Sequence, residues 1–128
     1  MSSAPIITAE MLAFLSEYHL ASLTTLRADG SPHVVPVGFS YDAELHVVRV
    51  ITFPSSVKYK NAVRGGRAVV SQVDGGRWLS LEGTVTGVSD PIRVAAAVAG
   101  YTARYRQPKE REDRVAIEIA VDRVLGRA

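Results

Sequence analysis

The chain has 128 residues, 47% of them hydrophobic and 22% charged, and this composition predicts one globular domain over residues 1–128. It contains no cysteine, which excludes disulfides and thiolate chemistry, and its formal net charge is only +2. Neither a signal-peptide pattern nor a run of ~20 apolar residues is present, so we expect a cytoplasmic protein without a membrane partner.

The spacing of apolar residues predicts three helices and six strands. In chain order they are a helix at 8–17, strands at 20–27, 33–41 and 45–52, a short helix at 57–64, strands at 68–73 and 78–88, a helix at 91–106 and a strand at 114–125. Hairpin links with few helices are typical of a closed antiparallel barrel and not of alternating βαβ units. The sequence therefore predicts a mainly β protein, a β-barrel with flanking helices.

Glycine and proline mark the places where this pattern should turn or bend. Asp29-Gly30, between two apolar runs, predicts a hairpin turn. Pro36 cannot donate a ladder hydrogen bond, so its strand should lie at a sheet edge, at a bulge or against a ligand. Gly38 permits close approach of another backbone or of a flat ring. Gly83, inside the longest predicted strand, indicates a bulge or bend.

The segment that follows the third predicted strand has the pattern of a phosphate site. Ser55 and Ser56 precede a short helix whose first residues include Lys58 and Lys60. The free N–H groups and partial positive charge of a helix start attract phosphate, and hydroxyl and ammonium groups add donors. No Asp or Glu occurs over 45–73, which suggests an anionic partner. The alternative is an ordinary serine cap on a solvated basic surface.

Other candidate residues are fewer and less specific. Trp78 can stack on an aromatic ligand or on a partner subunit, or serve as a core anchor, and Arg77 can pair with a phosphate or a carboxylate. The mixed charges of 109–114 predict a solvated surface turn. The three histidines lack metal-binding spacing, so no metal site is expected. No catalytic triad or P-loop is present, so an enzyme of this sequence would depend on a cofactor.

Three segments of the chain resemble the pyridoxamine-phosphate-oxidase-like split β-barrels. These segments are 24–37, 58–61 and 72–83. Within that superfamily the chain is most similar to the deazaflavin (F420)-dependent oxidoreductases, and in particular to those that reduce biliverdin. The resemblance implies a Greek-key, FMN-binding type of split barrel that forms a homodimer with cofactor sites between the two barrels.

The resemblance also implies which residues bind the cofactor. The backbone of one strand would run along the deazaflavin ring, at His33, Val35, Pro36 and Val37. The phosphate and its polyanionic tail would be held by Ser55, Ser56, Lys58, Lys60 and Asn61. A further strand, contributed across the dimer, would approach with Arg77, Trp78, Leu79 and Ser80. Arg49 and Arg77 are the candidates for binding carboxylates of the substrate.

Two functions follow as hypotheses. In the first, reduced coenzyme F420 delivers a hydride to a conjugated small molecule such as biliverdin, with FMN as the alternative cofactor. In the second, the protein is a non-catalytic carrier or storage protein for F420, FMN or haem. Small barrels with basic, aromatic surfaces also bind single-stranded nucleic acid, but this chain shows no stacking stripe, so no nucleic-acid partner is expected.

Overall fold

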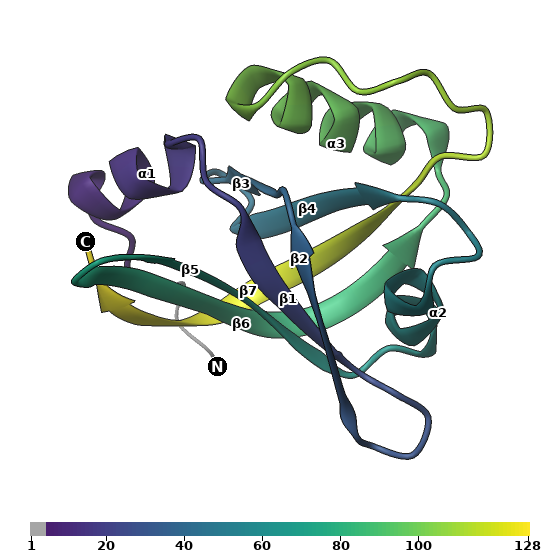
Figure 1. Ribbon diagram of the computed structural model, residues 1–128, viewed down its shortest axis with the longest axis horizontal. Coiled ribbons are helices and arrows are strands. Elements are labelled where there is room, and N and C mark those ends of the chain that lie inside the picture. The colour runs from purple at the N-terminus through teal and green to yellow at the C-terminus, as the bar shows by residue number, and fades with distance from the viewer. Residues whose placement is uncertain (1–4) are drawn as a thin grey trace.

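Seven antiparallel strands form one strongly curled sheet in the computed structural model, which describes residues 5–128 (Figure 1). The elements in chain order are α1 (Ala9–Ser16), β1 (Ala21–Leu26), β2 (Pro32–Val37), β3 (Ser40–Asp42), β4 (Val47–Thr52), α2 (Val57–Arg64), β5 (Arg67–Asp74), β6 (Arg77–Val88), α3 (Pro91–Arg104) and β7 (Val115–Arg127). All three predicted helices and five of the six predicted strands are confirmed with small shifts of boundary. None of the helices in residues 5–128 has the length and apolar character needed to cross a membrane, and a cytoplasmic location stays a prediction.

The predicted strand 33–41 is wrong in one respect, because it divides into β2 and β3. The break falls at Gly38 and Phe39, where α3 supplies the hydrogen-bond partners that a neighbouring strand would otherwise provide. The N–H of Phe39 donates to the hydroxyl of Tyr105 at 3.2 Å, and its carbonyl accepts from Arg104 at 2.9 Å. The backbone therefore leaves the ladder at this point without losing hydrogen bonds.

The sheet is split and not closed, which corrects the expected closed barrel. The strand order is β2-β1-β5-β6-β7-β4-β3, so the two edge strands are the two that follow one another in the chain. Pro36 lies in the edge strand β2, as its missing N–H predicts. The Gly38-Phe39 linker joins the two edge strands, β2 and β3. The pairs β1·β5 and β4·β7, whose strands are not consecutive in the chain, fit the expected Greek-key connections.

The inside of the curled sheet is filled by one main apolar cluster. Its most deeply buried side chains include Phe14, Leu23, Phe39, Val48, Val70, Leu79, Leu81, Ile117 and Ile119. The long strand β6 bends across this cluster through the predicted bulge, where the register with β7 shifts between Glu82 and Gly83. A side chain at Gly83 would collide with the carbonyl of Ala120. The bulge therefore requires glycine and allows β6 to pair along almost its whole length with β7.

Helix α2 is fixed to the outside of the sheet by polar contacts at both ends. At its start, the Ser56 hydroxyl oxygen accepts from the Tyr59 N–H at 3.2 Å and from the Thr52 hydroxyl at 2.9 Å. Further along, the buried amide of Asn61 donates to the Thr25 hydroxyl at 3.0 Å. These contacts set where the basic first turn of α2 lies relative to the edge of the sheet.

Candidate functional site

A cavity of about 570 Å³ lies between the edge strand β2, the start of α2 and the loop that joins α3 to β7. Its lining residues come from four elements and one loop. They are Pro36, Val37 and Gly38, Val50 and Ile51 of β4, Lys58 of α2, Tyr101 of α3, and Arg106, Gln107, Pro108, Lys109 and Arg114 of the loop. The cavity is thus built by parts of the chain that lie far apart in the sequence.

One part of the cavity lining is apolar. It follows the backbone from Pro36 to Gly38, against which the rings of Tyr101 and Tyr105 pack. A Cβ atom at Gly38 would lie 2.9 Å from the ring of Tyr101 and 3.0 Å from the ring of Tyr105, so only glycine fits without displacing them. The flat rings that approach Gly38, as the sequence predicts, are therefore those of Tyr101 and Tyr105 in the same chain.

Another part of the cavity lining is basic. Lys58, Arg106, Lys109 and Arg114 line the cavity, and no Asp or Glu does. Lys58 makes no ion pair with any of residues 5–128, and burial lowers the pKa of its ammonium group. A partly desolvated cation without a carboxylate partner is stabilised by an anionic ligand. The cavity therefore suits a ligand with a flat ring and a strongly anionic group.

The other residues predicted around α2 are placed differently from Lys58. Ser55 and Lys60 are exposed and do not line the cavity. The Ser56 oxygen already accepts two hydrogen bonds as the helix cap. The Asn61 amide donates to Thr25 and accepts from Arg64 at 2.5 Å. In the single chain, Lys58 is thus the residue of this set that reaches the cavity.

Only some of the cofactor-binding residues predicted along β2 line the cavity. Pro36 and Val37 line the cavity, while Val35 packs against the core cluster. His33 lies at the start of β2 opposite Thr25, and its Nδ1 atom is buried with no hydrogen-bond partner among residues 5–128. The ring wall predicted from the resemblance therefore corresponds to the end of β2 next to Gly38.

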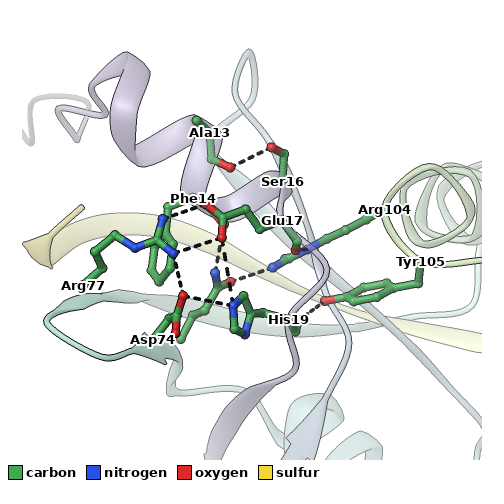
Figure 2. A network of polar contacts seen from close by, with 10 residues as sticks. Ala13, Phe14, Ser16, Glu17, His19, Asp74, Arg77, Arg104 and Tyr105 are labelled. Carbon is green, nitrogen blue, oxygen red and sulfur yellow. Dashed lines mark hydrogen bonds and ion pairs between the residues drawn. The ribbon is translucent and has the colours of Figure 1, made fainter.

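Arg77 is the first residue of β6, and two carboxylates of its own chain already neutralise it. Figure 2 shows its guanidinium between Glu17, at 2.6 Å, and Asp74, at 2.5 Å. These hydrogen bonds lower the pKa of both carboxyl groups and raise the pKa of the guanidinium. His19 completes the group, with its Nε2 atom 3.4 Å from Asp74. The cation that occupies this acidic cluster is Arg77 itself.

The residues after Arg77 also lie away from the cavity of their own chain. Leu79 is fully buried in the core, and the Ser80 hydroxyl donates to the Ser71 hydroxyl at 3.1 Å. Trp78 is 38% exposed on the outer side of the sheet. Within one chain, none of these residues lines the cavity described above. They can contribute to such a site only from a second copy, as the resemblance implied.

Carboxylates from other parts of the chain pair with basic residues of the stretch 45–73, which itself contains no Asp or Glu. Arg49 lies 3.0 Å from Asp42 and 3.9 Å from Glu118, and Arg67 lies 2.6 Å from Asp122. Arg49 and Arg77, the two candidates for substrate carboxylates, therefore both have carboxylate partners in their own chain.

The basic residues of the α3–β7 loop were missed by the sequence reasoning. The mixed charges of 109–114 predict a solvated turn, and Arg111 does pair with Asp113 in that way. Lys109 and Arg114, in contrast, line the cavity. The local pattern does not separate these two kinds of charge, because the separation depends on where the loop lies against β2.

The chain is similar in sequence to proteins of known class. Residues 7–128 match the family model described as pyridoxamine 5'-phosphate oxidase. A protein of Mycobacterium tuberculosis (strain CDC 1551 / Oshkosh), named F420H(2)-dependent biliverdin reductase, is 56% identical over 122 residues, which are 95% of this chain and 89% of that protein.

The fold is also found in solved structures. A conserved hypothetical protein of Mycobacterium tuberculosis matches with a TM-score of 0.79 at 22% identity, over 98% of this chain and 88% of that one. A protein described as an F420 reductase matches with a TM-score of 0.72 at 27% identity, over 88% and 94% of the two chains. The sequence match over residues 7–128, together with this shared split sheet, places the chain in the pyridoxamine 5'-phosphate oxidase family.

Proposed function

We propose that this chain is an F420-dependent reductase whose substrate is biliverdin or a conjugated tetrapyrrole dicarboxylate closely similar to it. The observation on which this depends most is the cavity with one apolar wall and one basic wall free of carboxylates. The relative named F420H(2)-dependent biliverdin reductase supports both the cofactor and the substrate at 56% identity.

The residues present fit the two ends of coenzyme F420. The backbone from Pro36 to Gly38 offers an apolar surface on which a deazaflavin ring can lie. Lys58, at the start of α2, is a cation without a counterion at the other end of the same cavity, and suits the phosphate. FMN also has a flat ring and a phosphate, and the comparison with the M. tuberculosis reductase favours F420.

Reduced F420, when bound, supplies the hydride for the reaction. The contribution of the protein is to hold donor and acceptor in contact and to keep bulk water from the reacting faces. The Gly38 wall is suited to this role because the rings of Tyr101 and Tyr105 pack against it. The basic wall neutralises ligands that would otherwise repel one another as anions.

The active form is proposed to be a homodimer. The outer face of β2, β1 and β5 exposes a row of apolar side chains, with Leu20 63%, Val34 59% and Val73 62% exposed. A groove of about 430 Å³ crosses this face and includes Pro36, which also lines the basic cavity. A second copy on this face would cover the apolar row and close the cavity at Pro36.

The test of this function is anaerobic oxidation of F420H2 by the purified protein, followed by absorbance, with and without biliverdin. Biliverdin-dependent oxidation is the expected result, and FMN is the control cofactor. Tight F420 binding without turnover would favour the carrier function instead. Absence of F420 binding would contradict the cofactor assignment.

A further inference from the structure

The four basic residues of the cavity occupy two different ends of it. Lys58, Lys109 and Arg114 also line an adjoining cavity of about 420 Å³, together with Phe53 and Glu110. Arg106 lines only the 570 Å³ cavity, beside the Pro36–Gly38 wall and Tyr101. Lys58 therefore marks the phosphate end and Arg106 marks the ring end.

Arg106 and Lys109 are also the two basic residues of the loop whose side chains have no polar partner among residues 5–128. Among residues 5–128, neither side chain makes a hydrogen bond or an ion pair. Their basic neighbours are all engaged: Arg104 in the interior, Arg111 with Asp113, and Arg114 with the Lys109 carbonyl. Two free cations thus remain at a cavity that no acidic side chain lines.

The loop that presents these cations is anchored at both ends. Before it, Arg104 donates to the carbonyl of Glu17, and Tyr105 donates to the His19 carbonyl at 2.6 Å (Figure 2). Arg104 also donates to the carbonyl of Phe39 and to the Gln72 side chain. After it, β7 begins at Val115 in the middle of the sheet. The backbone that supports Arg106 is therefore fixed next to the Gly38 wall.

We propose that Arg106 binds a carboxylate of the substrate while it is stacked on the cofactor ring, and so favours acidic substrates over their esters. This inference rests on the proposed function. A guanidinium binds a carboxylate through two parallel hydrogen bonds. The acidic tail of F420 follows the phosphate, so it is expected beyond Lys58, on the side of Glu110, and not at the ring end where Arg106 lies.

The experiment compares the wild type with the variant Arg106→Gln, using biliverdin and its dimethyl ester. Loss of the charge-assisted hydrogen bonds should raise KM for the diacid about tenfold or more, with little change in kcat. The preference for diacid over ester should disappear in the variant. Arg123→Gln is the matched control, because this exposed arginine lies on β7 outside the cavity with its nearest carboxylate, Glu82, 3.9 Å away.

Two results would overturn the inference. The first is an unchanged preference for the diacid in the Arg106→Gln variant. The second is a lower affinity of the variant for F420 that carries its glutamate tail, without any loss of affinity for tail-less F420. That result would assign Arg106 to the tail of the cofactor. Absorbance titration of biliverdin into cofactor-free protein separates this inference from the proposed function. Weaker diacid binding by the variant there supports it even if the wild type shows no turnover.

Discussion

Lys58 is the single side chain on which the cofactor assignment can be tested most directly. It lines the cavity without a carboxylate partner among residues 5–128, and burial lowers its pKa. Lys58→Ala should therefore weaken F420 binding about tenfold or more, as expected for one lost charge-assisted hydrogen bond. Fluorescence titration of F420 measures this directly. Lys60→Ala, two residues away on the exposed side of α2, is the control. Equal losses in the two variants would move the phosphate to the outer surface of α2.

The cluster around Arg77 predicts a pH dependence of stability. Hydrogen bonds from Arg77 lower the pKa values of Glu17 and Asp74 below their ordinary values of 4.5 and 3.8. Carboxyl groups with lowered pKa values stabilise the folded state above those ordinary values, and lose that contribution as the pH falls through the folded values.

Arg77→Gln should therefore lower Tm at neutral pH, and the difference from the wild type should shrink between about pH 5 and pH 3. Thermal melts across this range measure the difference. A Tm difference that stays constant down to pH 3 would show that the ion pairs do not account for the effect of the substitution.

At the scale of elements, the end of α3 holds the two edges of the split sheet in place. Arg104 is half-buried, makes no ion pair with a carboxylate among residues 5–128, and donates to three neutral acceptors, from the end of α1, the β2–β3 linker and β5. Its guanidinium also lies over the rings of Phe39, at 4.6 Å, and Tyr105, at 5.1 Å. One side chain thus ties the linker between the two edge strands to α1 and to β5.

The same substitution should lower the unfolding free energy strongly at Arg104 and hardly at all at Arg106. Arg104→Gln leaves buried carbonyl groups without donors and should cost about 2 kcal/mol of unfolding free energy. Arg106→Gln should change it by less than about 0.5 kcal/mol, because that side chain is exposed and unpaired. Urea unfolding of the two variants checks this contrast. Equal stabilities would mean that the Arg104 contacts do not hold the sheet edges.

The sequence predicted elements well wherever the determining contacts are local. The first helix, the Asp29-Gly30 hairpin and the Gly83 bulge all depend on nearby residues or on backbone geometry. The split of 33–41 depends instead on Tyr105 and Arg104, more than 60 positions along the chain. The site divides in the same way: Lys58 follows from a local helix pattern, whereas Arg106 belongs to it only through the tertiary placement of its loop.

At the scale of the whole molecule, the outer face of the sheet is the surface on which the proposed second copy would complete the site. In the registers of β5 with β6 and of β6 with β7, Val73 faces Trp78, and Ser80 faces Leu125. Val73, Trp78 and Leu125 are exposed, so apolar surface continues from β5 to β7. Trp78 and Ser80, which lie away from the cavity of their own chain, are therefore on the face that a second copy is proposed to cover.

Val73→Asp should convert the proposed dimer to a monomer, because burying an unpaired carboxylate at the centre of an apolar interface is strongly unfavourable. Light scattering after size-exclusion chromatography measures the mass, and F420 titration of the same sample should show weaker binding. Ile92→Asp, on the exposed side of α3 at 80% exposure, is the matched control and should leave both unchanged. A wild type that is monomeric and still binds F420 tightly would show that one chain makes the whole cofactor site, and Arg77 to Ser80 would then have no part in it.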